Sequence, residues 1–201
     1  MTKIQSVGLY ILTKYGKEAG TIELNKLFYL VDVASYRLFG TTISGTQYVR
    51  AEKGPYSRAI SRELRLLDDK QIQRTTKPSK GFSAILKVAW LVPQETTIES
   101  DLAPVEQEVI NRVLDKVKGL APRDLEKLSY KTEPMLHILD EEKKCNCPFL
   151  QEPLDFKEIK RDEFMQEFIS NLETPISEEE RKQIEYYDKE WEEVELMLQG
   201  K

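Results

Sequence analysis

The chain has little of what enzymes commonly use for catalysis. Its 201 residues include one histidine, His137, and two cysteines, Cys145 and Cys147. Neither phosphate-cradling pattern, G-x-x-x-x-G-K-[ST] or G-x-G-x-x-G, occurs, and no G-x-S-x-G turn is present to go with the histidine. A structural zinc site needs a second Cys or His pair, which Cys145-x-Cys147 lacks. We therefore expect a binding protein rather than an enzyme, with no metal and no cofactor.

Long hydrophobic runs are also missing. No run of eighteen apolar residues occurs, so the sequence predicts no membrane span. Residues 1–16 contain a short apolar run but no small-residue cleavage site, which is typical of an amphipathic helix rather than a signal peptide. The two cysteines stand too close together for an ordinary disulfide. We therefore expect a cytoplasmic protein.

Charge is unevenly distributed along the chain. Residues 1–139 carry 21 Lys/Arg and 16 Asp/Glu, a net of +5, whereas residues 140–201 carry 9 and 19, a net of −10. We divide the chain accordingly into one basic domain, residues 1–140, and an acidic helical extension, residues 141–201. The contrast indicates solvated helix faces in the extension, association of the two parts, or a charged partner.

Apolar periodicity predicts a mainly α fold with a small β-hairpin, an α+β class. Gly54-Pro55 is expected to begin a helix, because proline suits the first helical position. Helix, strand, helix and a basic-tipped hairpin is the order of a winged helix, here followed by C-terminal helices. We expect helices at 4–15, 55–67, 104–118, from 122 and at 155–172, and a hairpin from 72–75 and 82–92. Thr21 is expected to cap a further helix, which Gly40 ends after Phe39.

The most specific pattern lies at residues 25–56, NKLFYLVDVASYRLFGTTISGTQYVRAEKGPY. A K-L-x-Y-x-x-D helix precedes a G-x-x-I-x-G turn and a Y-x-x-x-x-x-G-P segment. This order resembles the core signature of the Panacea domain, the SocA-like antitoxin family, over roughly residues 5–137. Tyr130 stands where that family usually has histidine, and Met135 where it often has tryptophan. The matching positions are Lys26, Leu27, Tyr29, Asp32, Gly40, Ile43, Gly45, Tyr48, Gly54 and Pro55.

The resemblance implies an antitoxin of a type II toxin–antitoxin system, from a family that also has phage-associated members. Such a protein neutralises a cognate protein toxin by direct binding, or presents it to a protease as a SocA-like adaptor. We expect a rigid platform whose exposed Tyr and Arg side chains anchor the partner. The candidate partner-binding residues are Tyr36, Arg37, Tyr48, Arg50, Lys53, Tyr56, Arg58, Arg62, Arg65 and Trp191. An exposed seam around Trp191 would favour a homodimer or a complex.

Two features leave alternatives open. Asp32, at the edge of an apolar stripe, either accepts hydrogen bonds from a nearby hydroxyl or backbone N–H, or presents its charge to a bound protein. A basic face contacts either an acidic protein or DNA phosphates. It consists of Arg50, Lys53, Arg58, Arg62 and Arg65, with Lys77 and Lys80 on the hairpin. The DNA alternative is a winged-helix regulator that binds its operator, but the acidic overall charge favours a protein partner. An enzyme with a pocket at Asp32 or His137 is the third alternative.

Overall fold

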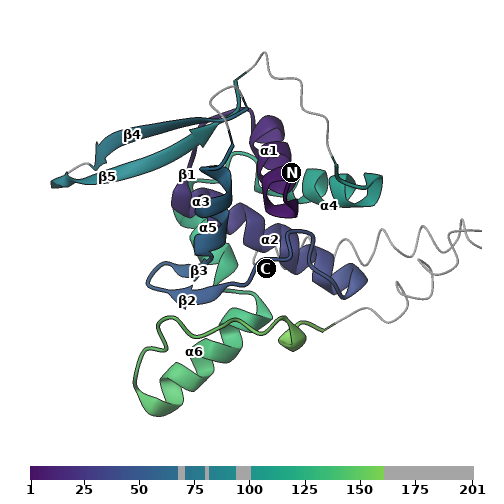
Figure 1. The fold of residues 1–201 in the computed structure, drawn as a ribbon. Coiled ribbons are helices and arrows are strands. Elements are labelled where there is room, and N and C mark those ends of the chain that lie inside the picture. Colours follow the sequence, from purple (N-terminus) through teal and green to yellow (C-terminus); the bar gives the residue numbers. More distant parts are fainter. Residues whose placement is uncertain (68–70, 80–81, 94–100, 161–201) are drawn as a thin grey trace, which may run out of the picture.

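The computed structural model describes residues 1–67, 71–79, 82–93 and 101–160. Its helices surround one core, and the hairpin of β4 and β5 projects from it (Figure 1). This confirms the predicted mainly α fold with a small antiparallel sheet. The helices are α1 (Lys3–Tyr15), α2 (Thr21–Phe39), α3 (Arg58–Leu64), α4 (Pro104–Val117), α5 (Pro122–Ser129) and α6 (Glu133–Cys145), with the 3-10 helix η1 (Phe156–Glu158). The strands are β1 (Ala19–Gly20), β2 (Val49–Ala51), β3 (Gly54–Tyr56), β4 (Gln73–Ser79) and β5 (Phe82–Leu91).

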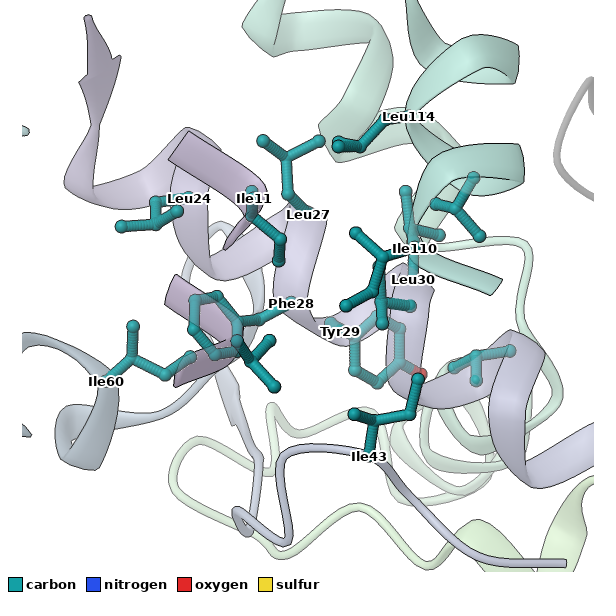
Figure 2. Close-up of a cluster of buried hydrophobic side chains, with 14 of the residues drawn as sticks. Ile11, Leu24, Leu27, Phe28, Tyr29, Leu30, Ile43, Ile60, Ile110 and Leu114 are labelled. Carbon is teal, nitrogen blue, oxygen red and sulfur yellow. The ribbon is translucent and has the colours of Figure 1, made fainter. Parts of the chain in front are cut away.

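Helix α2 is the centre of the molecule. Every residue from Glu23 to Ser35 is buried, because α1, α4, α5 and β3 pack on different sides of the helix. A helix buried on all sides belongs to the interior rather than to the surface. Its C-terminus is as predicted, since Gly40 adopts a left-handed φ of 69°. Figure 2 shows side chains that fill this core, among them Leu27, Phe28 and Leu30 of α2 with Ile110 of α4.

The strands form two separate antiparallel sheets. The larger has the order β1-β5-β4, and β1 joins it through the register Ala19↔Trp90. The smaller consists of β2 and β3 alone. Thr21, which was expected to cap α2, is instead its first helical residue, and its hydroxyl donates to Val88 O at 3.1 Å. Helix, short strand, helix and hairpin thus follow one another as predicted.

The prediction that Gly54-Pro55 begins a helix is wrong. Both residues belong to β3, where Pro55 lies opposite Arg50, and α3 begins only at Arg58. Proline accepts this position because β3 is an edge strand, where its missing N–H costs no ladder hydrogen bond. A contact from the core fixes the turn into α3, since the Ser57 N–H donates to Asn25 Oδ1 at 2.7 Å. Helix α3 is consequently shorter than the predicted 55–67.

Helix α6 was not predicted. Its buried stripe consists only of Pro134, Met135 and Ile138, which is too short to give a periodic signal. The predicted boundary between residues 140 and 141 falls inside this helix. Of the helix predicted at 155–172, residues 156–158 form a 3-10 helix. Residues 161–172, Lys80 and the Trp191 seam lie outside the described residues.

The expectation that the two cysteines stand too close together for an ordinary disulfide is also wrong. Cys145 and Cys147 form a disulfide, with their Cα atoms 5.3 Å apart. Asn146 between them ends α6 in a left-handed conformation, with φ 53°. This turn brings the two Cα atoms within the usual range for a disulfide.

Candidate partner-binding site

Asp32 anchors the loop that follows α2. The side chain is fully buried and its carboxylate accepts from the Ser44 N–H at 2.9 Å, from the Ser44 hydroxyl and from the Tyr48 hydroxyl at 2.7 Å. Burial raises the pKa of Asp32 to about 6, and the hydrogen bonds from Ser44 and Tyr48 limit that rise. Of the two interpretations of Asp32, hydrogen bonding is therefore confirmed and presentation of a charge to a bound protein is wrong.

Lys26 explains why Gly54 and Pro55 accompany it in the motif. Its ammonium group is buried and donates to Pro55 O at 2.7 Å. Burial lowers the pKa of Lys26 to about 7, although the nearby Glu126 carboxylate opposes this. A Cβ at Gly54 would lie 3.2 Å from the Lys26 nitrogen and 3.1 Å from the Tyr130 ring. The motif residues on α2 thus hold the loop and β3 against the core.

Tyr48 is not a surface anchor, and this prediction is wrong. The side chain is 1% exposed, its hydroxyl donates to Asp32, and its ring packs edge-on against Tyr29 with centroids 5.2 Å apart. The Tyr29 hydroxyl in turn lies 2.6 Å from Thr132 Oγ1. Both hydroxyl groups join distant segments of the core, so neither hydroxyl is available to a partner.

Arg50 is likewise not free for a partner, contrary to the prediction. It is largely buried, and its guanidinium contacts both carboxylate oxygens of Glu142, at 3.1 and 3.3 Å. It also donates to the Tyr130 hydroxyl at 3.3 Å, and that hydroxyl donates to Glu52 O at 3.1 Å. Arg50 therefore joins the turn between β2 and β3 to α5 and α6.

Arg37 is a second arginine that joins elements of the fold. It forms a partly buried ion pair with Glu133, which links the end of α2 to the start of α6. Tyr36 beside it is half-buried, with its ring packed against Phe156 at 5.7 Å between centroids. These two candidates are accordingly held in place by α6 and by the segment that follows it.

Three of the remaining candidates lie on a charged face formed by α3. The α3 arginine face consists of Arg58, Arg62 and Arg65, all exposed, at the i, i+4 and i+7 spacing that places them on one side of the helix. Arg62 has an ion-pair partner in the adjacent Glu63 at 3.3 Å. Leu66 follows directly, 70% exposed, and was missed in the sequence. Lys53 is exposed, Tyr56 is half-buried, and Trp191 is not among the residues described.

Sequence reasoning also missed a segment that packs against β2. We call residues 149–159 the C-terminal strap. Its backbone forms hydrogen bonds with β2 and with Tyr48, the residue before β2. The Arg50 N–H donates to Glu152 O at 2.8 Å, and the Leu154 N–H donates to Tyr48 O at 2.9 Å. The ring of Phe156 packs against Tyr29 and Tyr48, with centroids 5.8 and 5.9 Å apart. Of its apolar residues, Phe156 and Ile159 fall within the helix predicted at 155–172, whereas Phe149, Leu150 and Leu154 precede it.

Other features offer little chemistry in the described ranges. No group of three His, Cys, Asp or Glu side chains there is arranged to hold a metal ion. His137 is exposed, with Nδ1 3.5 Å from Glu158 Oε2. A cavity of about 620 Å³ between α1 and α4 has lysine and arginine together with Glu108 and Asp115 in its lining. None of the helices in this part of the chain is long and apolar enough to cross a membrane.

Comparison with known proteins identifies a protein family that the chain matches. Residues 24–134, more than half of the chain, match the model of the family described as antitoxin SocA-like, Panacea domain. Searches of curated proteins and of solved structures found no match. The matched range begins in α2 and includes the Asp32 and Lys26 networks and α3, whereas the C-terminal strap lies beyond it. The chain belongs to the family of SocA-like antitoxins with a Panacea domain.

Proposed function

We propose that this protein is the antitoxin of a type II toxin–antitoxin pair and neutralises a cognate protein toxin by binding it directly. Membership of the antitoxin family carries the proposal. The folded body supports it, since buried networks at Asp32 and Lys26 hold a rigid scaffold and leave the α3 arginine face exposed. Exposed arginines next to a hydrophobic side chain such as Leu66 suit a protein interface. No substrate turnover is part of the proposal.

Co-expression with the product of the adjacent open reading frame tests this function. We expect that product alone to arrest growth, the pair to restore it, and the two proteins to purify in stoichiometric complex. Arg62→Glu should weaken the complex at least tenfold, because it reverses the charge at the centre of the α3 arginine face. Arg112→Glu on α4 is the matched control, because Arg112 is a partly exposed arginine in a surface ion pair remote from α3 in sequence. Growth arrest that persists with both proteins folded and present would refute direct neutralisation.

A proteolytic adaptor would act on the same toxin through a protease. In that case the half-life of the toxin should shorten when the antitoxin is present, and rescue of growth should disappear in cells that lack the protease. A directly neutralising antitoxin leaves the toxin at full abundance in an inactive complex. Measuring toxin abundance during rescue therefore separates the two mechanisms.

DNA binding is the second candidate, and the arrangement of the larger sheet favours it. Strand β1 precedes the central helix α2 and pairs with β5 of the hairpin. In the sequence, α3 lies between α2 and the hairpin, and its arginines are exposed. In helix-turn-helix relatives the second helix enters the major groove. Binding of operator DNA should then weaken steeply with salt, since each phosphate contact releases counterions. Binding that is absent at low salt would exclude this candidate.

A further inference from the structure

The C-terminal strap occupies the open edge of the small sheet. Strand β2 pairs with β3 on one side, and on the other side Val49 forms a bridge with Pro153. Gln151 N–H donates to Arg50 O at 2.7 Å, which adds to the bonds from residues 50 and 154. Figure 1 shows this segment returning from α6 along β2. An extended peptide that adds to an exposed strand edge is a general mode of peptide recognition.

An aromatic pocket lies next to this edge. Three tyrosine rings, those of Tyr29, Tyr36 and Tyr48, contact Phe156 of the strap with centroids 5.7 to 5.9 Å apart. Leu154 is also buried, and because alternate residues of an extended chain share a face, it enters together with Phe156. We call the β2 edge and these three rings the strap groove. The groove thus accepts an extended backbone with an apolar side chain followed, two residues later, by an aromatic one.

The strap is held in an unfavourable conformation at the point where it meets β2. Gln151 has a φ of 70°, in the left-handed region that glutamine adopts rarely. The linkage to α6 makes this turn necessary, because the Phe149 N–H is held by Glu142 at 2.9 Å while residue 151 must already pair with Arg50. A segment that is not connected to α6 would enter the same groove without this turn.

The walls of the strap groove belong to the family domain, whereas the strap that occupies it does not. All three tyrosines and β2 lie inside the range matched by the family model, and the strap lies outside it. We propose that the strap groove is a binding site for an extended segment of the partner toxin, with the pattern apolar-x-aromatic, and that the strap fills this site in cis until the toxin segment replaces it. This inference rests on the proposed antitoxin function, because that function supplies the partner.

A labelled peptide of residues 148–160, PFLQEPLDFKEIK, tests whether the groove exchanges its occupant. Its binding to the full chain is measured by fluorescence anisotropy. Phe156→Ala in the protein should weaken the strap and increase peptide affinity at least tenfold over the unmodified chain, and Phe156→Ala in the peptide should abolish that gain. Leu150→Ala is the matched control, because Leu150 belongs to the strap but is 46% exposed, and it should leave affinity unchanged.

A second variant acts in the opposite direction and guards against loss of folding. Gln151→Gly removes the unfavourable conformation, because glycine adopts positive φ freely. It should hold the strap more tightly and decrease peptide affinity several-fold while the protein stays folded by circular dichroism. Equal peptide binding by the unmodified, Phe156→Ala and Gln151→Gly chains, or none by any of them, would overturn the proposed exchange.

Measuring how the same variants bind the toxin separates this inference from the proposed antitoxin function on which it rests. If the toxin uses the groove, Phe156→Ala should tighten its complex with the antitoxin and Gln151→Gly should weaken it. If the strap is instead part of the toxin-binding surface, Phe156→Ala should weaken the complex, and the inference fails while the antitoxin function stands. If no adjacent gene product binds at all, the antitoxin function fails, whatever the peptide assay gives.

Discussion

The hydroxyl of Tyr48 should stabilise the fold mainly by donating to the ionised carboxylate of Asp32. Tyr48→Phe removes that donor at 2.7 Å and leaves the two bonds from Ser44 in place. A hydrogen bond to a charged group contributes roughly 1.5–3 kcal/mol, and the carboxylate is fully buried, so water cannot replace the donor. We expect Tyr48→Phe to lower the free energy of unfolding by about 2 kcal/mol at pH 7.5.

The effect should depend on pH in a direction set by the pKa of Asp32. Because that pKa is raised to about 6, above the ordinary 3.8, the folded state holds a proton at Asp32 more readily than the unfolded state. The stabilisation from this protonation is complete below about pH 4 and is lost as the pH rises through 6. At pH 4.5 the carboxyl is neutral in the fold and needs the Tyr48 donor less. The loss caused by Tyr48→Phe should then decrease to about 1 kcal/mol or less.

Urea unfolding followed by circular dichroism at pH 7.5 and pH 4.5 measures both values. Tyr10→Phe is the matched control, because the Tyr10 hydroxyl bonds to a neutral group, Asn111 Oδ1, at 3.2 Å. It should cost about 1 kcal/mol or less, by the same amount at each pH. An equal loss for Tyr48→Phe at the two pH values would refute the assignment of an ionised Asp32 as its partner.

Three further substitutions test other contacts of the scaffold. The pKa of Lys26 is lowered to about 7 from 10.5, so the folded state binds fewer protons than the unfolded state between pH 7 and 10.5. The free energy of unfolding should therefore rise over this range. Lys26→Met should flatten that rise, which urea unfolding at several pH values measures. Glu142→Ala leaves the buried Arg50 guanidinium without its carboxylate and should cost about 3 kcal/mol in the same assay, more than Glu108→Ala in the exposed pair with Arg112. Gly54→Ala should lower the melting temperature by several degrees, because it combines a φ of 82° with contacts of 3.1 to 3.3 Å, whereas Gly119→Ala, with a φ of 81° and open space, should lower it less.

Local patterns were sufficient where neighbours in the sequence decide the structure. The apolar spacing of α2, the left-handed glycine at its end and the hairpin were all predictable, because each depends on contacts within a few residues. The same holds for the motif that identified the family. Prediction from local patterns failed at Pro55. Proline is compatible with both a helix start and an edge strand, and the pairing of Pro55 with Arg50 decided between them.

The sequence alone determined the fold class, the central helix and the family to which the chain belongs. Only the tertiary structure decided which polar side chains are available to a partner. Tyr48 and Arg50 have the residue types of an interface, yet Asp32 and Glu142 hold them inside, while Arg58, Arg62 and Arg65 remain exposed. The physical reason is that burial of a tyrosine or an arginine depends on finding a hydrogen-bond or ion-pair partner. For Arg50 that partner lies ninety-two residues away, on a helix with almost no periodic signal.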